Sequence, residues 1–72
     1  MKLFITRRFW LTAGQHGPAA TIDVRTNKSV SMAQAQANAE SHFEQKTKRK
    51  PVFCQNIKVS AAKPNYTIGP ES

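Results

Sequence analysis

The side chains that could do catalytic chemistry are few, and their spacing matches no known catalytic arrangement. The acidic residues are Asp23, Glu40, Glu44 and Glu71. Glu40 and Glu44 are one helical turn apart on the outer side of a predicted helix, where nothing would desolvate a general acid. The chain has no phosphate-binding glycine loop and no nucleophile elbow. The sequence therefore predicts a protein that is not an enzyme and has no catalytic residue.

The candidate metal ligands are equally sparse. His16, His42 and Cys54 are the only soft ligands, and they follow no metal-binding spacing. We expect no metal and no cofactor. A single cysteine excludes an internal disulfide and favours a reducing, cytoplasmic location. Cys54 falls within an apolar strand pattern, which is typical of a buried and inert thiol.

Charge is the strongest functional indication. The 72 residues include 11 Lys+Arg and 4 Asp+Glu, for a formal net charge of +7. Such a balance favours an anionic partner, either nucleic acid, an acidic protein surface or anionic lipid. Four of the cations form a basic cluster, namely Lys46, Lys48, Arg49 and Lys50. This cluster could hold a phosphate backbone without reading its sequence, although a solvated helix end has the same pattern.

The second indication is an aromatic and basic strand at residues 2–12, KLFITRRFWLT. Read with period two, one side presents Leu3, Ile5, Phe9 and Leu11 to a core, with Arg7 among them. The other side presents Phe4, Thr6, Arg8, Trp10 and Thr12. Aromatic rings beside cations are how open sheets hold single-stranded nucleic acid, so this second side is a candidate binding surface.

The remaining elements follow from alternation and capping. Glycines and a proline at 13–19 indicate a loop, and 20–26 alternates as an amphipathic strand. Residues 30–47 form the predicted helix, with Ser31 as N-cap and Pro51 beyond its end. Its apolar stripe comprises Met32, Ala35, Ala39 and Phe43. Residues 52–61 read as a third strand.

These elements predict an α+β fold, a small β-β-α-β domain at residues 1–62. The expected sheet is three-stranded and antiparallel, in the order 2-1-3, with one helix on one face. The central position suits the first strand because it is the most apolar. Residues 63–72 are expected to be an extended or flexible tail. The helix is expected to meet Leu3, Ile5, Phe9, Leu11, Ile22, Val24, Phe53, Ile57 and Val59.

The sheet face away from the helix, here called the open face, is the expected binding surface. Asp23, Cys54 and Asn56 are expected to lie beside its aromatic and basic residues. Together with the basic cluster, the predicted site comprises Phe4, Arg8, Trp10, Arg25, Lys46, Lys48, Arg49, Lys50 and Lys58. Three occupants of the face remain open: nucleic acid, a protein partner including a second copy in a homodimer, and the tail through Tyr66 and Ile68.

Neither export nor membrane insertion is predicted. No apolar run approaches the length of a membrane span. Residues 6–11, TRRFWL, resemble a twin-arginine export signal, but the following residues include Asp23 and no apolar region with a cleavage site. We therefore expect a protein that is not exported.

The size, basic charge and compact layout are similar to those of small accessory proteins of phages and plasmids. Many such proteins, anti-CRISPRs among them, block a host nucleic-acid machine by binding it. The resemblance implies an inhibitor that binds protein, and it carries over no functional residues. The sequence thus predicts a small basic binding protein that contacts nucleic acid or a nucleoprotein complex. The alternative is a phage- or plasmid-type inhibitor that blocks a host nucleic-acid-processing complex through protein contacts.

Overall fold

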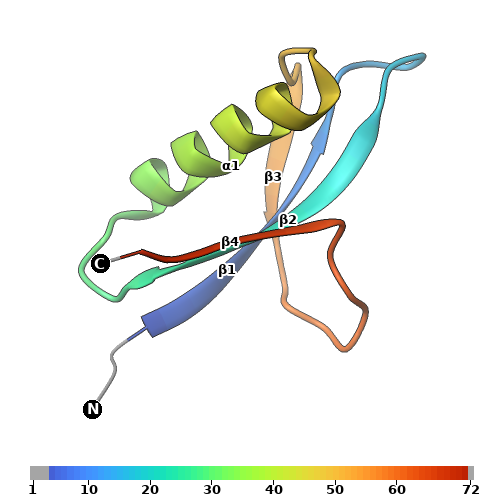
Figure 1. The fold of residues 1–72 in the computed structure, drawn as a ribbon. Helices are drawn as coiled ribbons and strands as arrows, with labels where there is room; N and C mark the ends of the chain where they lie inside the picture. Colours follow the sequence, from blue (N-terminus) through green and yellow to red (C-terminus); the bar gives the residue numbers. More distant parts are fainter. Residues whose placement is uncertain (1–3, 72) are drawn as a thin grey trace.

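The computed structural model describes residues 4–71 and shows one helix packed on one sheet (Figure 1). The elements are β1 (Phe4–Thr12), β2 (Ala19–Asn27), α1 (Met32–Thr47), β3 (Phe53–Ile57) and β4 (Tyr66–Glu71). The four strands form one sheet in the order β3-β1-β2-β4. β1 is antiparallel to both of its neighbours, whereas β2 and β4 are parallel. The predicted α+β class is confirmed, and the structure adds a fourth strand that makes the sheet mixed.

The hairpin of β1 and β2 forms the centre of the sheet, as predicted for β1. Its strands pair along their whole length, from Phe4 opposite Asn27 to Thr12 opposite Ala19. The loop between them closes when the Ala13 amide donates to the Pro18 carbonyl at 2.8 Å. Gly14 has a φ of 123° in this loop, a conformation that favours glycine because it has no Cβ.

The helix begins and ends at caps that the sequence encodes. The Ser31 hydroxyl accepts a hydrogen bond from the Gln34 amide at 3.1 Å, which confirms the predicted N-cap. Lys48 takes the left-handed conformation at the other end, with φ 64°, and its amide donates to the Glu44 carbonyl at 2.8 Å. No helix among residues 4–71 has both the length and the apolar character needed to cross a membrane.

The core lies between α1 and the two central strands. The helix buries Ala35, Ala39 and Phe43, while Met32, predicted to lie on the same stripe, is 43% exposed. The two alanines allow the helix to approach the sheet closely, and Phe43 fills the space toward the C-terminal end of α1. The sheet residues buried against them are Phe9, Leu11, Ala20, Ile22 and Val24. Ile5 is half-buried, and the predicted core residue Leu3 lies outside the described residues.

The predicted orientation of β3 was wrong. Cys54 pairs with Leu11 and Asn56 with Phe9, so Cys54 and Asn56 share the face covered by the helix. Phe53 and Ile57 therefore point to the open face, and Val59 lies beyond the strand at 44% exposed. The physical reason is that β3 lies at the edge of the sheet. The helix α1 packs chiefly on β1 and β2, so β3 makes few contacts with the core.

The segment expected to be a tail supplies β4. Tyr66 pairs with Ile22 and Ile68 with Val24, so both side chains lie on the helix side and pack against the core. They do not cover the open face, which removes the tail through Tyr66 and Ile68 from the three occupants that the sequence left open. Residues 66–71 form a strand because their backbone pairs with the edge of β2, which is remote in the sequence.

A different segment crosses the open face. β3 and β4 lie at opposite edges of the sheet, and residues 58–65 connect them. This crossing segment lies on the side of the sheet away from α1 (Figure 1). It is held at its end by the Asn65 amide, which donates to the Thr21 carbonyl at 2.8 Å. The open face is therefore partly covered by the chain itself.

Candidate functional site

The centre of the open face is occupied by a buried ion pair. Arg8 on β1 lies opposite Asp23 on β2, and its Nε and Nη2 donate to the two carboxylate oxygens at 2.7 and 3.1 Å. Arg8 Nη1 also donates to Ser60 Oγ of the crossing segment at 3.1 Å. Hydrogen bonding to Asp23 raises the pKa of Arg8, against the opposing effect of burial. Arg8, a predicted binding residue, is only 4% exposed and serves to fasten the crossing segment to the sheet.

This pair gives a stability prediction. We expect Asp23→Ala to lower the midpoint of thermal unfolding more than the double variant Arg8→Met/Asp23→Leu. The single change leaves a guanidinium without its carboxylate under the crossing segment, whereas the double change removes both charges. Circular dichroism melts of the three proteins measure the difference. An Asp23→Ala protein that melts with the wild type would show that the pair contributes nothing to stability.

The crossing segment divides the open face into two parts. On the side of the β1–β2 loop, Trp10 lies beside Phe53 of β3, with ring centroids 5.9 Å apart and ring planes at 62°. Trp10 is 36% exposed and Phe53 is 50% exposed. Phe4, the other predicted aromatic, lies at the far end of β1, about 20 Å from Trp10 at the usual rise of a strand. Trp10 and Phe53 are called the aromatic pair below, and Phe4 does not belong to it.

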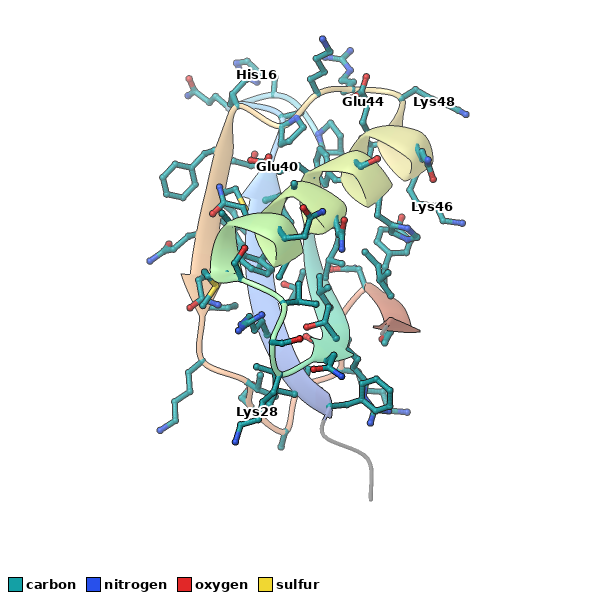
Figure 2. The ribbon with its side chains drawn as sticks, turned by 90° about the vertical axis from the view of Figure 1, so that its left-hand side faces the viewer. His16, Lys28, Glu40, Glu44, Lys46 and Lys48 are labelled. Carbon is teal, nitrogen blue, oxygen red and sulfur yellow. The ribbon has the colours of Figure 1, made fainter. Side chains whose placement is uncertain are left out.

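The basic cluster lies at the same end of the molecule as the aromatic pair. Its four side chains are exposed around the C-terminal end of α1, where Figure 2 labels Lys46 and Lys48. The Val52 amide, just beyond the cluster, donates to the carbonyl of Thr12 at the end of β1 at 2.8 Å. The chain thus passes from Lys50 to Phe53 in three residues while attached to the end of β1. The basic cluster and the aromatic pair therefore lie at the same end of the molecule, the cluster at the end of α1 and the pair on the sheet face away from α1.

The other predicted cations are dispersed. Arg25 is exposed on β2 opposite Thr6, on the far side of the crossing segment from Trp10. Lys58 is exposed directly after β3 and begins the crossing segment. Lys28, which was not a predicted site residue, lies at the opposite end of the molecule from Lys48 (Figure 2). Lys58 therefore lies at the other end of β3 from Lys50, and Arg25 lies on a different strand.

The charges of the basic cluster are not neutralised by ion pairs. Within the described residues, the one ion pair is that of Arg8 with Asp23. Glu40 and Glu44 share a shallow hollow with Lys50, Ser41 and Pro51, at distances that form no ion pair with the lysine. The acids reduce the local positive potential on the helix side of Lys50. Glu40 also acts electrostatically on Cys54, the residue after Phe53.

The environment of Cys54 and of His42 shifts the pKa of each side chain. Burial, with a smaller contribution from Glu40, raises the pKa of Cys54 to about 11, so the thiol is neutral near pH 7. Burial and then the charge of Lys46 lower the pKa of His42, whose ring contacts Tyr66 with centroids 5.4 Å apart. No group of three or more metal-ligating side chains occurs in the part of the chain that the structure describes.

Phe53 is the exposed aromatic residue of β3, a strand whose faces sequence reasoning assigned the wrong way round. Its alternation with Ile57 was read as a core pattern, and only the strand register shows that it lies on the open face beside Trp10. The sequence did show that Phe53 follows Lys50 by three residues, which puts an aromatic residue next to the basic cluster along the chain.

Comparisons with protein-family models, curated proteins and solved structures found no match for this chain. The class that the structure itself defines is a small α+β domain with the element order β-β-α-β-β. Its single helix covers a four-stranded mixed sheet in the order 3-1-2-4.

Proposed function

We propose that this protein is a small, non-catalytic nucleic-acid-binding protein that holds a phosphate backbone on the basic cluster. The observation that carries the proposal is the gathering of four exposed cations at the C-terminal end of α1, the end of the molecule that also exposes the aromatic pair. Cations without ion-pair partners can release the counterions of a polyanion, which is the main source of affinity in such contacts. The net charge of +7 adds attraction at longer range. A cytoplasmic location, where nucleic acid is available, accords with the single thiol.

The proposal assigns binding to fewer residues than the sequence predicted. Lys46, Lys48, Arg49 and Lys50 contact phosphates, and Trp10 contacts the ligand beside them. Arg8 is excluded because its charge is used by Asp23, and Phe4 and Arg25 are excluded because they lie beyond the crossing segment.

A protein partner is the second candidate. Phe53 and Trp10 are 50% and 36% exposed and form a contiguous apolar surface. Val52, the neighbour of Phe53 in the sequence, is 71% exposed. Exposed aromatic surface of this kind is typical of protein interfaces, where tryptophan is a favoured anchor. In this alternative the chain inhibits a host nucleic-acid-processing complex by covering a site on it. A homodimer through the same surface is less favourable because each copy brings the same positive charge.

A salt titration tests the proposal. Fluorescence anisotropy of labelled oligonucleotides should give a log-log slope of about −3 for single strands, because four phosphates contribute about −0.7 each. We expect binding to be readily measured at about 50 mM salt and much weaker at about 200 mM. An affinity that does not change with salt would contradict contact through the basic cluster. Absence of binding to any oligonucleotide at micromolar protein would leave the protein partner as the better explanation.

A further inference from the structure

Resting on the proposed function, we infer that the ligand is a single strand lying along β3, with its bases on the aromatic pair. Its phosphates would extend from the basic cluster at one end of β3 to Lys58 at the other. This assigns Phe53 and Lys58 to one binding path and distinguishes a single strand from a duplex as the preferred substrate.

The geometry of the aromatic pair favours unpaired bases. The rings of Trp10 and Phe53 meet edge to face at 62°, so the edge of one ring occupies part of one face of the other. Half of Phe53 and about a third of Trp10 remain open to solvent. The bases of a duplex already stack on one another, so only an unpaired base can place its face against these rings.

The position of β3 defines the path of the strand. β3 is an edge strand of five residues, about 17 Å long at the usual rise. Lys50 precedes it and Lys58 follows it, so cations bracket the aromatic pair along the chain. A path of this length holds a short segment, on the order of 4 nucleotides, which is the lower end of the range for one small domain.

Charge identifies the occupant. A second copy of the chain would bring a formal charge of +7 and its own basic cluster to the same edge. Asp23, the acid at the centre of the open face, is paired with Arg8 and does not oppose an incoming phosphate. The crossing segment covers part of the face through its contact with Arg8, and the exposed rings of Trp10 and Phe53 lie at one end of it.

The chain contains one tryptophan, so its fluorescence reports the proposed contact directly. We expect single-stranded oligo-dT or oligo-U of about 4 to 12 nucleotides to quench Trp10. A blunt duplex with the same number of phosphates should quench it far less. The oligo-dT and oligo-U arms show whether DNA or RNA is preferred, and quenching by either supports the inference.

Matched variants separate stacking from charge. Phe53→Ala should weaken single-strand binding about 5- to 150-fold while leaving duplex binding and the salt slope unchanged. Met32→Ala, another exposed apolar residue at the opposite end of α1, should have no effect. On this path Lys58 adds a fifth phosphate contact and makes the single-strand slope about −3.5, so Lys58→Ala should return it to about −3. Lys28→Ala, at the end of the molecule away from Lys48, should leave the slope unchanged.

Two results would overturn the inference, and they are distinguishable. Salt-dependent binding of single strand and duplex with equal affinity, without Trp10 quenching, would reject the single-strand path and leave the proposed function standing. No binding of either form would reject both. The quenching arm uses the wild-type protein, so it remains decisive if Phe53→Ala fails to give the wild-type circular dichroism spectrum.

Discussion

Replacing Phe43 by alanine is expected to lower the free energy of unfolding by about 3–5 kcal/mol. Phe43 is fully buried and is the one large side chain on the buried stripe of α1, where its companions are Ala35 and Ala39. Its removal leaves a cavity between helix and sheet that small neighbours cannot fill. A domain of this length has a total stability of about 4–11 kcal/mol, so the variant would lose a large share of it.

Urea unfolding followed by circular dichroism measures this effect. Met32→Ala is the matched control because it removes a large apolar side chain from the same helix at a position that is 43% exposed. We expect the control to change the free energy of unfolding by less than about 1 kcal/mol. A Phe43→Ala variant as stable as the control would contradict the packing of α1 on the sheet.

Neutralising the basic cluster is expected to abolish most of the affinity for nucleic acid. The quadruple variant with glutamine at positions 46, 48, 49 and 50 loses the four cations that the proposed function places on phosphates. At about 0.1 M salt the loss should be several hundredfold, since four contacts contribute a slope of about −3. Both single strands and duplexes should lose affinity, whatever their sequence, because phosphate contacts carry no sequence information.

A charge-matched control separates contact from overall charge. The double variant Arg25→Glu/Lys28→Glu has a formal net charge of +3, the same as the quadruple variant. Both of its positions lie away from the aromatic pair, so its affinity and salt slope should remain close to those of the wild type. Equal losses in the two variants would mean that net charge, rather than the basic cluster, attracts the ligand.

The sequence alone determined the elements whose boundaries and buried faces follow from their own residues. Alternation predicted β1 and β2 together with the buried faces that carry Phe9 and Ile22. Ser31 and Pro51 indicated the two ends of the helix. An N-cap hydroxyl and a proline that lacks an amide hydrogen both act on neighbouring residues, so their effects can be read from the sequence. The basic cluster and Trp10 were also available from the sequence, because exposure of cations and strand parity are local properties.

The tertiary structure alone decided three features that depend on partners remote in the chain. The face presented by Phe53 follows from the pairing of Cys54 with Leu11, and alternation alone cannot show which of two faces the helix covers. β4 owes its order to the edge of β2, since its own residues carry little apolar pattern. The burial of Arg8 arises from Asp23, 15 residues away, and Ser60, 52 residues away. The sequence alone suggested that the Arg8 guanidinium is an exposed binding group. The fold shows that its hydrogen bonds are made within the chain, to Asp23 and Ser60.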